Sequence, residues 1–345
     1  NSDVVSDTTQ PTTEVTEETT VESKIKEVEK NKDFIKLSDN ENNYVNTKTG
    51  KVYQRVSSFI AIVEITDKEY KDFVDNGIVS PIIINSIVEK IKTGIELTTQ
   101  EQAIRKEKAE EIEEALIENS TLKSSQTIGT KVDELVRDFF ADEEIDLSKY
   151  NVSSKEETKK FLEELQKIKD KMKKDNEKVL SNDIVLYNDE IGVAGTVDLL
   201  TYDNKGVVRI YDMKTMRGNN FTEYYARHTA NKYETTVFGK SKKQKHTEQL
   251  SMYRMLLNNT HGLKAKELKI IPIEISYKGG DTTTSKLNLL ETVELKPLDK
   301  IKNAELTLTK VDSVEDAEQA ELKSQLDDLN NRLKNLISEV PINLD

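Results

Sequence analysis

The chain has 345 residues, of which 35% are hydrophobic and 33% are charged, and its formal net charge is −13 at pH 7. It lacks the run of about 18 apolar residues that a membrane span needs. The chain contains no cysteine, which excludes disulfides, thiolate nucleophiles and zinc sites built on sulfur. A metal ion would therefore be a hard cation held by carboxylates. The acidic total also argues against a bulk nucleic-acid binder, although a basic groove can lie on an acidic enzyme.

Three regions are expected along the chain. Residues 1–32 are rich in Thr, Ser, Val and Glu, a composition that predicts a disordered acidic tail or linker. A main domain is expected over 33–300, with its core at about 127–277, and a helical segment follows over 301–345. The chain begins without Met and without a signal peptide, so we expect a processed product or a piece of a longer protein.

The order of predicted elements is typical of an α/β (α+β) fold. Residues 44–66 place a turn at Thr49 and Gly50 between β-rich stretches, which predicts a hairpin or the start of a strand. Helical periodicity covers five segments: 82–95, 102–117, 127–140, 155–180 and 248–258. Strand patterns occupy four segments: 184–187, 192–202, 206–213 and 268–277. These elements predict a small central mixed β-sheet flanked by helices.

The last predicted element, within residues 311–340, carries regularly spaced leucines. Their spacing alternates between four and three residues, as in the a/d seam of a coiled coil: Leu322, Leu326, Leu329, Leu333 and Leu336. The pattern predicts a short coiled coil or a helical hairpin. Contact with a partner chain or a larger assembly and packing back on the domain are equally compatible with it.

Three charged residues in the strand region suggest chemistry. Asp212 and Lys214 are two apart on one predicted strand, so their side chains project to the same face. Asp198 lies on the neighbouring strand across a hairpin, within reach of that face. Two carboxylates and one ammonium suit a divalent cation and an anionic substrate. The alternative is a solvated sheet face, but Asp198 interrupts an apolar run, where burying a lone carboxylate is costly.

Four motifs occur in order around these residues. They are the segment 128–137, which contains Gly129 and Thr130, then Gly195-Thr196-Val197-Asp198, Asp212-Met213-Lys214, and Gln249 with Tyr253 four residues later. Together they resemble the PD-(D/E)xK nucleases of the RecB-like branch, over roughly residues 50–280. Bacteriophage-encoded members look most similar, including the segment 53–58 ahead of the core. The resemblance implies a restriction-endonuclease-like core.

The resemblance also implies an activity and its residues. The expected function is divalent-metal-dependent hydrolysis of DNA by a phage exonuclease or end-processing nuclease, in which Asp198, Asp212 and Lys214 are catalytic. One or two Mg²⁺ or Mn²⁺ ions would be held by Asp133, Asp198, Asp212 and the carbonyl of Met213, and Lys214 would orient or activate a water. Asp133 stands where the family usually offers histidine. The alternative is a non-catalytic nucleic-acid-binding or structural module in a larger phage assembly.

Two groups of residues are expected to contact DNA, single- or double-stranded. Gln249 and Tyr253 share one face of a helix that touches the nucleic-acid strand in the family, although Tyr253 could equally be core. The second group lies in the basic, aromatic segment 227–246, which suits a phosphate backbone or is simply a solvated loop: Arg227, Lys240, Lys242, Lys243 and Lys245. The expected location is the cytoplasm, that of the host for a phage protein, with the virion as the alternative.

Overall fold

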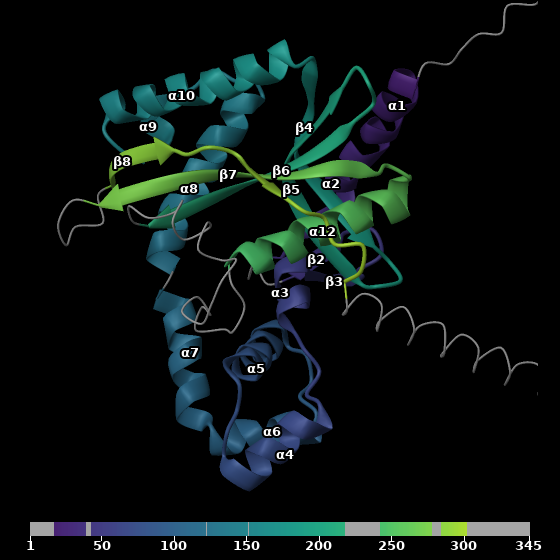
Figure 1. Ribbon diagram of the computed structural model, residues 1–345, viewed down its shortest axis with the longest axis vertical. Helices are drawn as coiled ribbons and strands as arrows, with labels where there is room; N and C mark the ends of the chain where they lie inside the picture. Colours follow the sequence, from purple (N-terminus) through teal and green to yellow (C-terminus); the bar gives the residue numbers. More distant parts are fainter. Residues whose placement is uncertain are drawn as a thin grey trace, which may run out of the picture.

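The computed structural model describes residues 17–38, 43–121, 123–150, 152–217, 242–277 and 284–301. Within this part of the chain, a mixed nine-stranded sheet is flanked by helices, and a helical lobe extends below it (Figure 1). The expected α/β class, a mixed sheet with helices around it, is confirmed. None of the described helices is long and apolar enough to cross a membrane.

Helices and strands have the following bounds along the chain. The helices are α1 (Glu17–Glu29), α2 (Asn31–Phe34), α3 (Val56–Ala61), α4 (Asp67–Asn76), α5 (Pro81–Thr93), α6 (Thr99–Glu107), α7 (Ala109–Thr121), α8 (Lys123–Phe140), α9 (Leu147–Tyr150), α10 (Lys155–Lys174) and α12 (Lys242–His261). The strands are β1 (Ile35–Leu37), β2 (Asn43–Asn46), β3 (Val52–Arg55), β4 (Glu177–Asn188), β5 (Val193–Asp203), β6 (Val208–Arg217), β7 (Ala265–Tyr277), β8 (Thr284–Leu289) and β9 (Val293–Leu295).

The sheet runs in the order β1-β2-β3-β5-β6-β7-β8, while β4 pairs with β5 and β9 pairs with β7. Two pairs, β3 with β5 and β6 with β7, are parallel, and the other described pairs are antiparallel. The hairpin expected around Thr49 and Gly50 joins β2 to β3, and Gly50 has the left-handed φ of +74° that such a turn favours. The sheet is larger than expected, because this hairpin and β1 extend it beyond β5.

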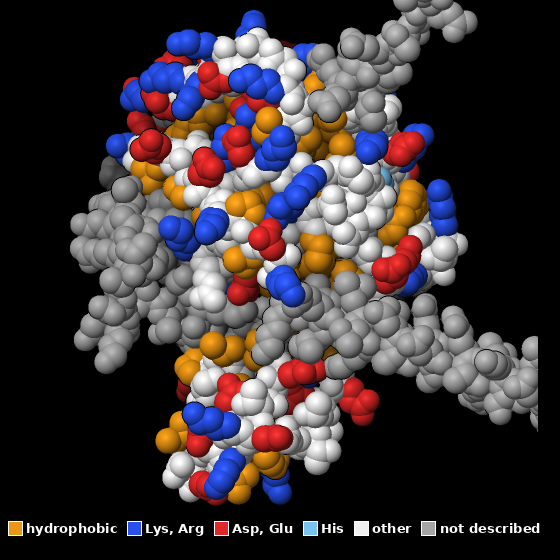
Figure 2. Space-filling view, turned by 45° about the vertical axis from the view of Figure 1, so that its right-hand side comes forward, with side chains coloured by type: hydrophobic (Ala, Val, Ile, Leu, Met, Phe, Trp, Pro, Cys, Tyr) orange, Lys and Arg blue, Asp and Glu red, His pale blue; other side chains and the backbone are white. Residues whose placement is uncertain are grey.

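Both faces of the sheet are covered by amphipathic helices. One face packs against α1, α3 and α12. The buried residues of these helices include Ile25 and Val28 of α1 and Leu256 of α12. The other packs against α8 and α10 through residues such as Leu135 and Leu165. Over α10, Lys side chains alternate with Asp and Glu on the outer surface (Figure 2). The charged face of α10 is therefore solvated while its apolar stripe is buried.

The helical lobe comprises α4 to α7 and has an apolar core of its own, which includes Ile83, Ile87 and Ile104. Lys90 and Glu101 form a buried ion pair beside this core, with Nζ 2.8 Å from Oε1 and side-chain exposures of 11% and 2%. The single helix expected over 102–117 is instead two helices, because α6 ends at Glu107 and α7 begins at Ala109.

Two further expectations are corrected. The tail expected over 1–32 is not disordered throughout, because α1 occupies Glu17–Glu29 and buries Ile25 and Val28 against the sheet. The helix expected over 155–180 ends at Lys174, and β4 begins at Glu177. The predicted leucine seam within 311–340 lies outside the described residues.

Candidate active site

The candidate site lies where one edge of β5 changes its strand partner. At one end of this edge, β3 pairs with Val193 and Ala194, and at the other end β6 pairs with residues 199–202. In the described sheet, residues 195–198 pair with neither strand, which opens a gap between β3 and β6. The N–H of Met213 donates instead to Asp198 Oδ2 at 2.7 Å. The Asp198 carboxylate thus satisfies a backbone donor that would otherwise need a strand partner.

Asp212 and Lys214 project into the same gap from β6. Asp212 is buried, and its Oδ2 lies 2.6 Å from Lys214 Nζ, whose side chain is 23% exposed. Burial disfavours the charged ammonium, but the carboxylates of Asp212 and Asp198 outweigh it and raise the pKa of Lys214. The structure therefore brings Asp198, Asp212 and Lys214 together, as the strand spacing predicted.

Asp133 reaches the site from α8, which approaches β6 closely. A Cβ added to Gly129 would lie 2.8 Å from Thr215 Oγ1, so glycine permits this approach. One helical turn later, Asp133 lines the same cleft as Asp198 and Asp212. Its Oδ1 atom is buried and has no hydrogen-bond partner among the described residues.

The carboxylates interact with one another strongly. Burial, together with the charge of Asp212, raises the pKa of Asp133 to about 7. Burial and the charges of Asp212 and Asp133 raise the pKa of Asp198 to about 8, although Lys214 and the Met213 N–H oppose this rise. Asp133 and Asp198 therefore share one electrostatic environment in which burial and neighbouring negative charge disfavour their ionised forms.

The donor set of this cleft suits a hard divalent cation. Among the described residues, no three acidic or histidine side chains form a ready-made metal cluster. Mg²⁺ nevertheless needs few protein ligands, since it usually keeps several waters and binds one or two carboxylates together with substrate phosphate. The unpartnered Oδ1 of Asp133 and the raised pKa values of Asp133 and Asp198 are features that a bound cation would relieve.

The cleft around these residues has a volume of about 690 Å³. Five basic side chains line it, against four acidic ones, on a chain whose net charge is −13. The basic residues are Lys32, Lys36, Arg55, Arg137 and Lys214, and the acidic residues are Asp133, Asp183, Asp198 and Asp212. The local excess of cations suits a negatively charged substrate.

Gln249 and Tyr253 of α12 lie at the inner wall of this cleft. Tyr253 is 5% exposed and belongs to the core, and its hydroxyl accepts a hydrogen bond from Gln249 Nε2 at 3.0 Å. A Cβ on Gly195 would lie 2.7 Å from Tyr253 Cε1, so the glycine makes room for the ring. Tyr253 is thus a core residue, which was the alternative given for it, and Gln249 and Tyr253 both border the site.

The other residues expected to bind nucleic acid are distributed differently. Lys243 and Lys245 lie in the first turn of α12, which begins at Lys242. Lys243 and Lys245 do not line the cleft, among the residues that the structure describes there. Arg227 and Lys240 lie outside the described residues.

Four cleft cations are missing from the sequence-based site: Lys32, Lys36, Arg55 and Arg137. Arg137 could have been found, because it follows Asp133 by four residues and so shares its helical face. The other three come from α2, β1 and β3. Their position depends on the pairing of β3 with β5, for which the local sequence gives no signal.

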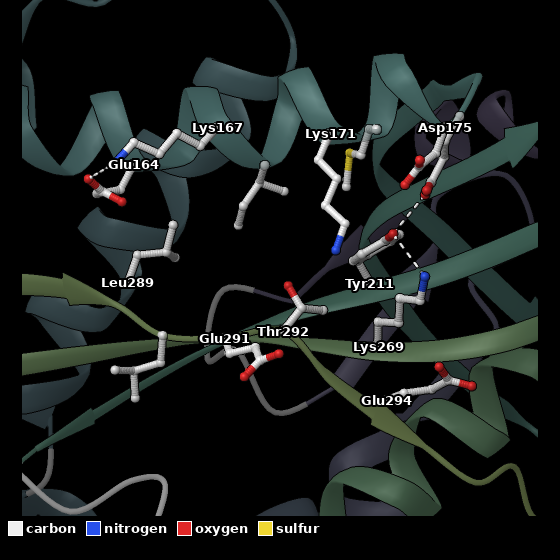
Figure 3. Close-up of a pocket in the computed structure, with 14 residues that line it drawn as sticks. Glu164, Lys167, Lys171, Asp175, Tyr211, Lys269, Leu289, Glu291, Thr292 and Glu294 are labelled. Atoms are coloured by element: carbon white, nitrogen blue, oxygen red, sulfur yellow. Dashed lines mark hydrogen bonds and ion pairs between the residues drawn. The ribbon is translucent and has the colours of Figure 1, made fainter.

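A second pocket, of about 480 Å³, lies between α10 and the strands and shares no lining residue with the first (Figure 3). Tyr211 lines this pocket while its neighbour Asp212 lines the first, because successive residues of a strand point to opposite faces. Lys171 and Lys269 point into it, but acidic side chains outnumber lysines in its lining. The second pocket is therefore less suited to an anionic substrate.

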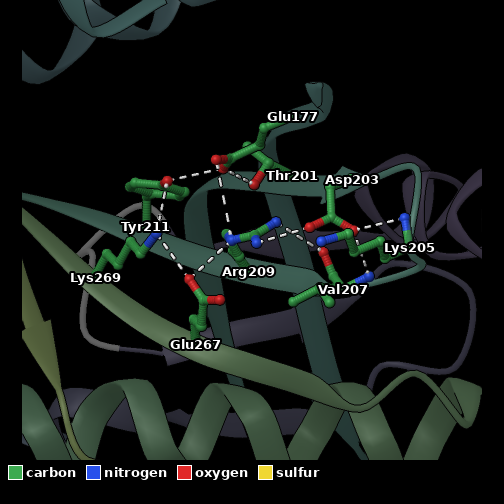
Figure 4. Close-up of polar contacts among 9 residues, drawn as sticks. All are labelled: Glu177, Thr201, Asp203, Lys205, Val207, Arg209, Tyr211, Glu267 and Lys269. Atoms are coloured by element: carbon green, nitrogen blue, oxygen red, sulfur yellow. Dashed lines mark hydrogen bonds and ion pairs between the residues drawn. The ribbon is translucent and has the colours of Figure 1, made fainter. Parts of the chain in front are cut away.

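A polar network supports β6 behind the site (Figure 4). Arg209 donates to Asp203 and to Glu267, each at 2.8 Å, and the Tyr211 hydroxyl donates to Glu177 at 2.8 Å. Side chains from β4, β5, β6 and β7 thus satisfy one another across the sheet, which holds the strand that carries Asp212 and Lys214 in register.

The residues of this cleft carry the functional conclusion. No protein-family model matches the chain, and no curated protein matches it.

Proposed function

We propose that the protein is a divalent-metal-dependent nuclease that hydrolyses phosphodiester bonds in DNA, built on a restriction-endonuclease-like core of the RecB-like branch. The observation that carries this proposal is the convergence of Asp198, Asp212 and Lys214 in one cleft where basic side chains outnumber acidic ones. Carboxylates beside a lysine suit a metal ion and a phosphate at the same point.

Asp133, Asp198, Asp212 and the Met213 carbonyl would hold Mg²⁺ or Mn²⁺. When bound, the cation polarises the phosphate and lowers the pKa of a coordinated water. Asp198 is kept in place by the Met213 N–H, so its orientation is fixed before substrate binds. A prearranged site of this kind reduces the reorganisation needed during the reaction.

Lys214 acts as a fixed positive charge in this proposal. Its pKa is raised by Asp212 and Asp198 in spite of burial, so the ammonium keeps its proton at neutral pH and is poorly suited to accept one from water. Its N–H donors would orient the attacking water and stabilise the charge that develops on the phosphate oxygens. Of the two roles expected for this lysine, orientation is favoured over proton abstraction.

The test uses labelled linear and covalently closed circular DNA, incubated with the protein in Mg²⁺, Mn²⁺ or EDTA. The Lys214→Ala variant should lose cleavage, while Lys106→Ala, which removes an exposed lysine of the helical lobe, should cleave like the wild type. Loss of linear DNA that spares circles indicates an end-dependent nuclease, and cutting of circles indicates an endonuclease.

Two outcomes would refute the proposed activity. Metal-independent binding without cleavage would support the non-catalytic binding module, with the aspartate at position 133 as the first suspected cause. An inactive protein that also fails to bind DNA would exclude both functions.

A further inference from the structure

Arg137 is, after Lys214, the cleft cation that interacts most with the acidic residues of the site. It follows Asp133 by one turn of α8, and its side chain is 25% exposed. Burial opposes its charge, but the carboxylate of Asp183, followed by those of Asp198 and Asp133, raises the pKa of Arg137. The guanidinium therefore lies within the field of two proposed metal ligands, whereas Lys32 and Lys36 are exposed residues of α2 and β1.

An ion pair with Asp183 holds Arg137 in the cleft. Arg137 Nη1 donates to Asp183 Oδ1 at 2.8 Å, and the Asp183 side chain is 54% exposed. Asp183 lies in β4 with a left-handed φ of +58°, which is uncommon for a residue with a side chain. Ion pairs this exposed contribute about 1 kcal/mol or less, so the pair can be exchanged for a stronger one.

A phosphodiester is a suitable replacement for the Asp183 carboxylate. Its two non-bridging oxygens match the planar guanidinium, and arginine binds phosphate with two parallel hydrogen bonds. A phosphate in this cleft would also face Asp133 and Asp198, so it needs a cation beside it in addition to the metal ion. Arg137 is placed to supply that charge from the α8 wall.

We infer that Arg137 binds a phosphate of the nucleic-acid strand next to the scissile bond, and that Asp183 is a positioning residue that keeps the guanidinium in the cleft before substrate arrives. This inference rests on the proposed nuclease function. If the ion pair between Arg137 and Asp183 only joined α8 to β4, replacing either residue should weaken DNA binding to the same extent.

The experiment measures binding of fluorescein-labelled single-stranded and duplex oligonucleotides over a series of KCl concentrations, in the Lys214→Ala background so that no DNA is cut. Arg137→Gln should weaken binding about tenfold or more, as for a lost charge-assisted hydrogen bond. It should also reduce the slope of log K against log salt by about 0.7 to 0.9, the loss of one phosphate contact.

Three further variants complete the design. Arg137→Lys should keep the salt slope, because the charge remains, while losing affinity through its poorer geometry. Asp183→Asn should also keep the slope and bind with nearly unchanged affinity, because the lost positioning of the guanidinium and the lost competition with phosphate act in opposite directions. Arg105→Gln, at an exposed position of α6, makes the same charge change outside the cleft and should have no effect.

The inference is overturned if Arg137→Gln leaves the slope unchanged, or if Asp183→Asn weakens binding as much as Arg137→Gln does. If Arg137→Gln fails to fold, the slopes of Arg137→Lys and Asp183→Asn decide the question. If the wild type cleaves DNA but Arg137→Gln leaves the slope of log K against log salt unchanged, this inference is refuted and the proposed function stands. A wild-type protein that neither cuts nor binds DNA refutes the proposed function and the inference together.

Discussion

Asp133→Asn should stabilise the metal-free protein. Burial and the charge of Asp212 raise the pKa of Asp133 from 3.8 to about 7, and each pH unit corresponds to about 1.4 kcal/mol. Above pH 7 the ionised carboxylate therefore lowers the free energy of unfolding by up to about 4 kcal/mol. Asparagine has nearly the same shape and carries no charge, so it removes this penalty.

The pH dependence has a defined sign. Asp133 keeps its proton to a higher pH in the folded protein than in the unfolded chain, so the folded state binds more protons between about pH 4 and 7. Stability in EDTA is then unaffected by this group below pH 4 and falls as the pH rises through that window. The advantage of Asp133→Asn over wild type should widen from pH 5 to pH 8, as measured by urea unfolding followed by circular dichroism.

Magnesium should narrow the difference in stability between the two proteins. A cation that binds only the folded state adds about 2.7 kcal/mol when its concentration is 100 times Kd. Wild type should gain this stabilisation at pH 8, whereas Asp133→Asn, which lacks one ligand, should gain less. Removal of the metal with EDTA should restore the original difference.

Asp138→Asn is the matched control, because it alters another aspartate of α8. Burial opposes ionisation there too, but hydrogen bonds from Tyr150 and Lys149 outweigh it and lower the pKa of Asp138. This carboxylate therefore adds stability above about pH 4 and loses it as the pH falls, so its removal should destabilise the protein at pH 8. The reasoning fails if Asp133→Asn is no more stable than wild type at pH 8 in EDTA, or if its advantage is the same at pH 5.

Three further predictions concern packing and buried polar groups. Gly195→Ala should lower stability by about 1–3 kcal/mol in urea unfolding, because the new Cβ would lie 2.7 Å from Tyr253 Cε1; an unchanged midpoint would mean that the ring moves freely. Tyr253→Phe keeps the buried ring but loses the hydrogen bond from Gln249, so a loss of about 1 kcal/mol is expected, and a loss as large as that of Tyr253→Ala would contradict this. Lys90→Met leaves Glu101 charged and buried and should destabilise by about 3–5 kcal/mol; Lys90→Met combined with Glu101→Gln should recover more than half in thermal unfolding, and no recovery would contradict a charge effect.

The parts of the fold that could be predicted are those with a local pattern. The helical stripe of α8, the hairpin between β5 and β6 and the two-residue spacing of Asp212 and Lys214 are all properties of short segments. They brought Asp198, Asp212 and Lys214 to one place, as the structure shows. Even α1 has such a pattern, because Val21, Ile25 and Val28 follow a helical period, but the polar composition around it concealed the signal.

The parts that could not be predicted depend on contacts between distant segments. The parallel pairing of β3 with β5 carries Lys32, Lys36 and Arg55 into the cleft, and no turn or periodicity encodes it. The gap at residues 195–198 has the same origin, since it exists because β3 and β6 share one edge of β5. The sequence could therefore indicate the candidate catalytic residues, but not the other residues that line the cleft.

The basic residues that line the cleft change what the net charge implies about substrate binding. A chain with a net charge of −13 repels a polyanion at long range, but at physiological salt such repulsion is screened beyond about 8 Å. The proposed affinity for DNA would then come from short-range contacts inside the cleft, where basic side chains outnumber acidic ones. Few phosphates can be contacted in this way, and each contributes to the salt dependence of binding. If the proposed function holds, the protein should bind its substrate through a small number of well-placed contacts, so the loss of a single cation such as Arg137 should weaken binding strongly.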